Sequence, residues 1–156
     1  MSVTDSTTLR LERTFDAPAP EVFDAWTNPE VLKRWWAVDP NGRTPVAEVD
    51  LRVGGGYRLT MEDAAGEQAH TVRGEYREVS RPERLVYTWA WEDADGATGP
   101  VSVVTVEFHE EGERTTVVLV HTGLSDAASR DRHGVGWNGC LDNLARRVLP
   151  ASRVRG

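Results

Sequence analysis

The chain has 156 residues, the length of one ordinary domain and enough to bury a core without disulfides or metals. Hydrophobic residues make up 39% and charged residues 28%, a composition typical of globular chains and too apolar for a disordered one. The net charge of −7 argues against nucleic acid as a main partner, and the single cysteine excludes an internal disulfide.

Membrane insertion and export are not indicated by any segment. The residues from Met1 to Thr8 are polar and no apolar run approaches the length of about 18 residues that a membrane span needs. We therefore expect a cytoplasmic protein with one domain over residues 9–150, flexible ends over 1–8 and 151–156, and no membrane span.

The first third of the chain predicts one strand and two short helices. Apolar residues at every second position from Leu9 to Phe15 are typical of a half-buried strand. The apolar residues between Val22 and Trp26 have helical spacing, and this helix must end before Pro29. Asn28 as an N-cap, with Pro29 at the first helical position, predicts a second short helix that ends near Trp36.

Alternation with a period of two dominates residues 46–122. It is cleanest at Leu85, Tyr87, Trp89 and Trp91. The runs are separated by turn signals, namely Ala65-Gly66, Arg81-Pro82, Asp95-Gly96 and Glu111-Gly112. One-sided strands joined by short turns predict an antiparallel sheet with one covered face.

A long amphipathic helix follows the strands. Its apolar stripe recurs at helical spacing, at Trp137, Leu141, Leu144 and Val148. Ser125 or Asp126 can cap its start, and Pro150 ends it. The order of elements predicts an α+β fold, in which a curved antiparallel sheet of about seven strands wraps around this C-terminal helix.

Two glycine-rich segments resemble phosphate-binding loops only superficially. The segment from Gly134 to Gly139 has the spacing G-x-G-x-x-G, but no strand precedes it and no acidic residue follows at the required distance. Its glycines indicate either close packing of the helix on the sheet or a soft gate over a cavity. The run from Gly54 to Gly56 precedes a strand and predicts a bulge or a close approach of chains.

Among the titratable residues, two histidines are in phase with the interior. His121 shares the strand phase of Leu119, and His133 lies one helical turn before Trp137. Both are compatible with ordinary hydrogen-bonded histidines and with pocket residues. No histidine pair has metal-ligand spacing and no catalytic motif is visible, so we expect no metal, no cofactor and no nucleophilic role for Cys140.

The aromatic residues carry the most information. Most of the rings fall on the predicted inner faces, which is explained either by plain core packing or by a small-ligand pocket lined with rings and a few polar groups. The candidate ligand-binding residues are Trp35, Trp36, Tyr57, Met61, Tyr76, Tyr87, Trp89, His121, His133, Trp137 and Leu141.

Several motifs in one order resemble a known family. They are Phe15-Asp16-Ala17-Pro18, the segment from Val22 to Thr27, Trp35-Trp36, Gly54-Gly55-Gly56-Tyr57, Gly74-Glu75-Tyr76, the segment from Arg81 to Leu85, the segment from Val104 to Phe108, the segment from Val120 to Leu124, and Gly136-Trp137 with Leu141 and Leu144. The chain thereby resembles the activator of Hsp90 ATPase homologue-like family, which belongs to the START-like superfamily of polyketide cyclases and the birch-pollen allergen.

This resemblance implies a helix-grip fold with a hydrophobic cavity between the sheet and the long helix. The leading hypothesis is binding of a small hydrophobic or aromatic molecule. The alternatives are a cyclase- or aromatase-like enzyme, in which a histidine or tyrosine acts as general acid or base, and a stress-related, chaperone-associated protein. The chain is too short for the separate chaperone-stimulating domain of the eukaryotic co-chaperone, and a homodimer is compatible with the fold but not required.

Overall fold

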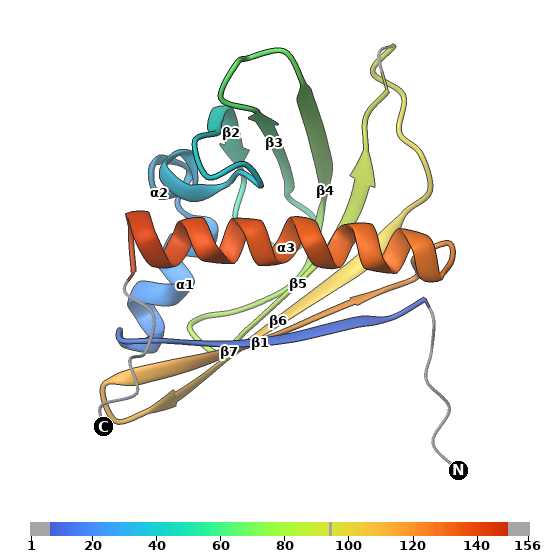
Figure 1. Ribbon diagram of the computed structural model, residues 1–156. Helices are drawn as coiled ribbons and strands as arrows, with labels where there is room; N and C mark the ends of the chain where they lie inside the picture. The colour runs from blue at the N-terminus through green and yellow to red at the C-terminus, as the bar shows by residue number, and fades with distance from the viewer. Residues whose placement is uncertain (1–6, 94, 150–156) are drawn as a thin grey trace.

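Seven antiparallel strands form a curled sheet with the strand order β1-β7-β6-β5-β4-β3-β2, and a long helix lies across its inner face (Figure 1). The computed structural model describes residues 7–93 and 95–149. The elements in chain order are β1 (Leu9–Phe15), α1 (Ala19–Thr27), α2 (Pro29–Trp35), β2 (Arg43–Val49), β3 (Gly56–Glu62), β4 (Ala69–Ser80), β5 (Arg84–Trp91), β6 (Ser102–Glu111), β7 (Arg114–Thr122) and α3 (Ala127–Arg147). This architecture confirms the predicted helix-grip fold. The ends expected to be flexible, 1–8 and 151–156, lie almost wholly outside the described residues.

The two short helices follow from the local sequence. Helix α1 ends at Thr27, and the side chain of Asn28 then accepts a hydrogen bond of 3.0 Å from the backbone N–H of Glu30. Pro29 occupies the first position of α2, where its missing N–H has no helical partner to lose. The predicted break between the helices is therefore confirmed. Trp35, the last residue of α2, and Trp36, which follows it, are buried in the core.

The strand register gathers the large side chains on the inner face. Tyr87 on β5 lies opposite Val104 on β6, and Val104 lies opposite His121 on β7. Trp89 pairs with Ser102 in the adjacent inward-facing row. Because side chains two residues apart share a face, this register places His121, Ser102 and Trp89 close together in the interior.

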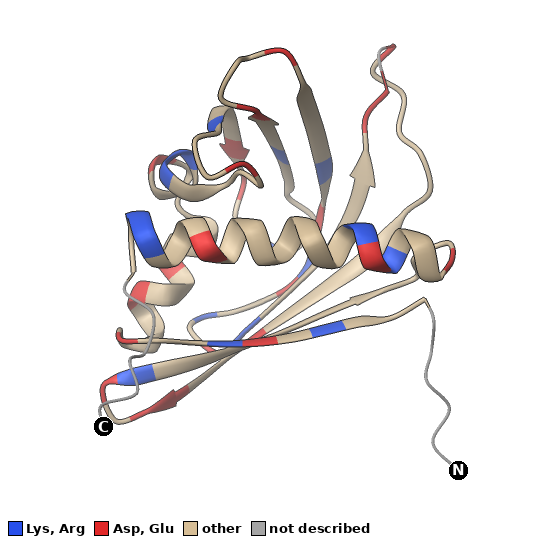
Figure 2. Cartoon of the chain, in the orientation of Figure 1, with Lys and Arg blue, Asp and Glu red and all other residues tan. Residues whose placement is uncertain are grey.

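Helix α3 closes the open side of the sheet. Asp126 caps it by accepting a hydrogen bond of 2.8 Å from the N–H of Ser129, which decides between the two predicted caps. Trp137, Leu141 and Leu144 are all at most 2% exposed. Figure 2 shows that the charged residues of α3 lie toward its two ends, so the middle of the helix presents an uncharged surface to the interior. No helix within the described residues has the length and apolar character to cross a membrane.

The glycines of α3 allow close packing, but on another segment than the sheet expected from the sequence. A Cβ on Gly139 would lie 2.7 Å from the carbonyl oxygen of Val38, whereas one on Gly134 would meet only the side chain of Leu9, at 3.4 Å. At its glycines this helix therefore approaches the segment after α2 more closely than the sheet. Asn143 fixes the same segment, because its amide donates to the carbonyl oxygens of Ala37 and Asp39 at 2.7 and 3.0 Å.

Candidate functional site

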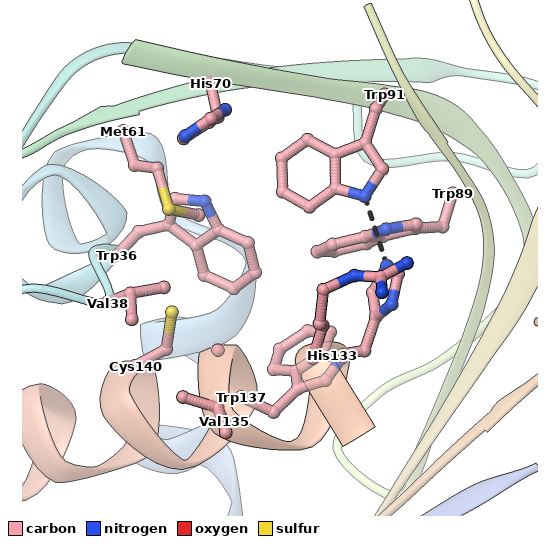
Figure 3. Close-up of a pocket in the computed structure, with 12 residues that line it drawn as sticks. Trp36, Val38, Met61, His70, Trp89, Trp91, His133, Val135, Trp137 and Cys140 are labelled. Carbon is pink, nitrogen blue, oxygen red and sulfur yellow. Dashed lines mark hydrogen bonds between the residues drawn. The ribbon is translucent and has the colours of Figure 1, made fainter. Parts of the chain in front are cut away.

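A pocket of about 430 Å³ lies between the sheet and the first half of α3 (Figure 3). Its walls are mainly aromatic and apolar, as in most small-molecule sites. It is lined by Trp36, Val38, Met61, His70, Trp89, Trp91, Arg132, His133, Val135, Gly136, Trp137 and Cys140.

Three parts of the fold supply this lining. The sheet contributes residues from the end of β3, from the start of β4 and from the end of β5. The segment after α2 contributes Trp36 and Val38. The helix contributes His133, Gly136, Trp137 and Cys140, which follow the spacing i, i+3, i+4 and i+7 and so share one face. The pocket thus exists only where these separate segments meet.

Trp89 is the centre of the aromatic wall. Its ring centroid lies 5.0 Å from that of Trp137, 5.3 Å from that of Trp91 and 5.8 Å from that of Trp36. Edge-to-face and tilted contacts at such distances contribute about 0.5–1.5 kcal/mol per pair beyond burial. The rings therefore support one another and form a preformed wall.

His133 is held in one orientation by hydrogen bonds at both ring nitrogens. Its Nδ1 lies 2.8 Å from the carbonyl oxygen of Ser129, and its Nε2 lies 3.1 Å from the indole nitrogen of Trp91. A carbonyl only accepts and an indole N–H only donates, so these bonds assign the proton to Nδ1 and leave Nε2 as the acceptor. Figure 3 shows this bond to Trp91 at one side of the pocket.

His121 is fully buried behind the pocket wall. Its Nδ1 accepts a hydrogen bond of 3.2 Å from the indole of Trp137, which places its proton on Nε2. Nε2 lies 2.7 Å from Oγ of Ser102, and this hydroxyl donates to the carbonyl oxygen of Trp89 at 3.3 Å. Burial, with a smaller contribution from His133, lowers the pKa of His121 to about 3, so the ring is neutral.

These bonds argue against a serine–histidine nucleophile. A histidine base must accept the hydroxyl proton, but here Nε2 of His121 donates toward Ser102. Ser102 is 6% exposed and does not line the pocket. The chain of bonds therefore positions Trp137 and closes the core.

Two indole N–H groups in the pocket wall have no hydrogen-bond partner in the described part of the chain. They belong to Trp36 and Trp89, whose residues are 2% and 4% exposed. A buried donor without an acceptor costs about 1–3 kcal/mol. Both nitrogens are buried within the wall and are not accessible from the pocket, so they add this cost to the folded state.

Cys140 lies on the floor of the pocket as a small apolar group. Its side chain is buried, and burial raises the pKa of its thiol to about 12. The thiolate is the reactive form of cysteine, so this residue contributes to packing and not to nucleophilic chemistry.

Apart from His121, the predicted site residues separate into two groups. Trp36, Met61, Trp89, His133 and Trp137 line the pocket. The three tyrosines do not, because Tyr57, Tyr76 and Tyr87 pack against one another with ring centroids 5.2–6.0 Å apart. The space left beside them is only about 20 Å³.

Hydrogen bonds and burial fix this second group as core. The hydroxyl of Tyr57 donates to the carbonyl oxygen of Thr88, and that of Tyr87 accepts from the indole of Trp26. Burial raises the pKa of all three tyrosines, and neighbouring tyrosines raise that of Tyr57 further. Trp35 and Leu141 are at most 1% exposed and belong to the same closed core.

Several lining residues were not among the candidates. Trp91 has the strand phase of Trp89, and His70 has that of Val72, so alternation alone contained a signal for both. Arg132 is four residues before Gly136 on α3, a spacing that places them on neighbouring turns. Val38 lies in an irregular segment, and no periodic signal identifies it.

Comparisons with known proteins agree with this architecture. Proteins of solved structure from Chromobacterium violaceum and Silicibacter pomeroyi are both 29% identical to the chain with TM-scores of 0.80. The first match covers 91% of this chain and 96% of that chain, and the second covers 89% and 95%. The second is described as an AHSA1 protein.

An HSP90 activator from Plasmodium falciparum shares the fold at 24% identity, with a TM-score of 0.73 and coverage of 94% of this chain and 99% of that chain. No curated protein matches the sequence. The family model described as activator of Hsp90 ATPase homolog 1-like protein matches residues 16–148. The chain therefore belongs to the activator of Hsp90 ATPase homolog 1-like family.

Proposed function

We propose that the protein binds a small hydrophobic or aromatic molecule in the pocket under α3. The observation that carries this proposal is a preformed, ring-lined pocket of about 430 Å³, within the range of roughly 300–1,000 Å³ typical of small-molecule sites. The rest of the aromatic interior is filled, so the opening is local and not a sign of loose packing.

The rim of the pocket supports the same proposal. Val135 is 70% exposed and Val38 is 37% exposed, and both line the pocket. Large apolar side chains left in water at the edge of a cavity mark binding surfaces, because a ligand that covers them removes apolar area from solvent.

Catalysis has less support from the geometry. Both nitrogens of His133 and both of His121 are engaged with protein partners, so neither ring offers a free acceptor to a substrate. A general base needs such an acceptor within hydrogen-bond reach of the proton that it removes. A cyclase-like role for His133 would require Trp91 to release its Nε2.

A chaperone-associated role has no specific observation on this chain. The HSP90 activator from Plasmodium falciparum shares the fold, but at 24% identity this likeness does not extend to partners. Such a role would be indicated by retention of a purified Hsp90 on the immobilised protein.

Titration with N-phenyl-1-naphthylamine, a neutral apolar fluorophore, tests the binding proposal. We expect saturable binding by the wild type, an increase in its melting temperature with probe concentration, and quenching of tryptophan fluorescence. Native mass spectrometry of freshly purified protein would then identify a molecule that copurifies.

A pocket-filling variant places the probe. A Cβ on Gly136 would make an ordinary van der Waals contact with Val38 at 3.6 Å, and Gly136 lines the pocket, so Gly136→Leu is expected to occupy the pocket and abolish binding. Gly99→Leu is the control, because a Cβ on Gly99 meets nothing within 4 Å and Gly99 does not line the pocket. The proposal fails if the wild type shows no saturable binding, or if Gly136→Leu binds as well as Gly99→Leu.

A further inference from the structure

We infer that the pocket selects an apolar molecule that carries a carboxylate, with the carboxylate held at the rim by Arg132. This inference rests on the proposed function and names the chemical class of the ligand. It depends on a charge distribution that the apolar walls alone do not reveal.

Arg132 is the only charged residue of fixed sign in the pocket lining. The chain carries 25 acidic residues against 18 basic ones, yet neither an aspartate nor a glutamate lines the pocket. The remaining titratable lining residues are two histidines and the buried cysteine. The lining of this pocket therefore carries one fixed positive charge and no negative one in an acidic protein, which favours anionic ligands.

The guanidinium of Arg132 has no ion pair or hydrogen bond to a side chain or backbone group in residues 7–93 and 95–149. The adjacent carboxylate of Asp131 bonds with Arg130 instead, at 3.3 Å. Several exposed arginines on the sheet are paired, for example Arg10 with Glu12 at 3.4 Å. Arg132 is thus exposed with its donors available, and a planar guanidinium can bind a carboxylate through two parallel hydrogen bonds.

The sheet side of the pocket offers a second exposed donor. His70 is exposed, lines the pocket and lies edge-to-face with Trp91 at a centroid distance of 6.1 Å. Figure 3 shows His70 and Trp91 projecting from the sheet toward the pocket that α3 closes. An imidazole always carries at least one N–H, whereas the unpartnered indole nitrogens of Trp36 and Trp89 are buried within the wall, so the accessible donors lie at the exposed end of the pocket. This polarity sets the expected orientation: body inward, carboxylate outward.

Three naphthalene derivatives of matched size test the inference. They are 2-naphthoate, the neutral 2-naphthalenemethanol and the cationic 2-naphthylmethylamine, each titrated by calorimetry at pH 7 and low salt. We expect the wild type to bind the carboxylate about fivefold more tightly than the alcohol, the upper end for an exposed ion pair, and the amine most weakly. Added salt should reduce the preference for the carboxylate.

The variant Arg132→Gln removes the guanidinium from an exposed position without changing the apolar walls. It is expected to bind 2-naphthoate about fivefold more weakly and 2-naphthalenemethanol unchanged. Arg10→Gln gives the same change of net charge away from the pocket and should retain the wild-type order. Decanoate compared with decanol shows whether an aliphatic body is accepted in place of the aromatic one.

The outcomes separate the two proposals. If the alcohol and the carboxylate bind equally well to the wild type, or if Arg132→Gln leaves the preference intact, the inference about the carboxylate is wrong while the pocket still binds apolar molecules. If none of the three derivatives binds and N-phenyl-1-naphthylamine also fails, the proposed function itself is wrong.

Discussion

Acid should destabilise the protein through His121 before most carboxylates titrate. The folded chain holds this ring neutral, because burial lowers its pKa from 6.5 to about 3. The unfolded chain leaves it in water, where it binds a proton below pH 6.5. Since the unfolded state then binds more protons, the free energy of unfolding rises with pH between 3 and 6.5 and is fully regained above that window.

The magnitude follows from the two pKa values. Between pH 7 and pH 5 this single residue is expected to remove about 2 kcal/mol from the free energy of unfolding, out of about 5 kcal/mol over the whole window. Such a loss is a large part of the stability of an ordinary domain.

Urea denaturation at pH 7 and pH 5, followed by tryptophan fluorescence, measures this loss in the wild type and in His121→Gln. Glutamine keeps a donor and an acceptor but does not titrate, so the variant should lose about 2 kcal/mol less than the wild type on acidification. His109→Gln, at an exposed position on β6, removes an imidazole without touching the buried network and should keep the wild-type loss. Equal losses in the wild type and in His121→Gln would refute the assignment of a neutral, buried His121.

Three further changes test the packing around the pocket, each by urea denaturation at pH 7. Trp137→Ala should cost about 3–5 kcal/mol, because its ring is 2% exposed and contacts three other tryptophans; a cost below about 1 kcal/mol would contradict this packing. Gly139→Ala should cost about 1–3 kcal/mol through the clash with Val38, while Gly136→Ala should gain about 0.5–1 kcal/mol of helix propensity; equal effects would show that α3 does not approach this segment closely. Asn143→Ala should cost about 1–3 kcal/mol, since two carbonyl groups lose their donor, and a neutral effect would mean that water replaces it.

Local patterns were sufficient for the elements of secondary structure. The alternation from Leu85 to Trp91 corresponds to β5, and the break at Asn28 and Pro29 separates α1 from α2 as expected. The reason is that exposure to water on one face and burial on the other imposes the period of each element directly on its sequence. The family resemblance added the fold, and the match over residues 16–148 agrees with it.

Local sequence patterns could not predict which inward-facing residues belong to the filled core and which line the pocket. Strand phase assigns Tyr57 and Trp89 equally to the inner face, yet Tyr57 lies in a filled cluster and Trp89 lines the open pocket. Phase states which side of the sheet a side chain takes, but whether space remains beside it depends on the volumes contributed by other segments.

The sequence by itself therefore determined which residues form strands and helices, which face each side chain takes, and that tryptophans and two histidines share one interior. Only the tertiary structure decided where that interior stays open and what lines its rim. Asn143 binds the carbonyl groups of Ala37 and Asp39, on either side of Val38, and Asp131 pairs with Arg130 and leaves Arg132 free at the pocket. These outcomes depend on contacts between segments distant in the chain and on competition among neighbouring charges, and neither leaves a periodic trace in the sequence.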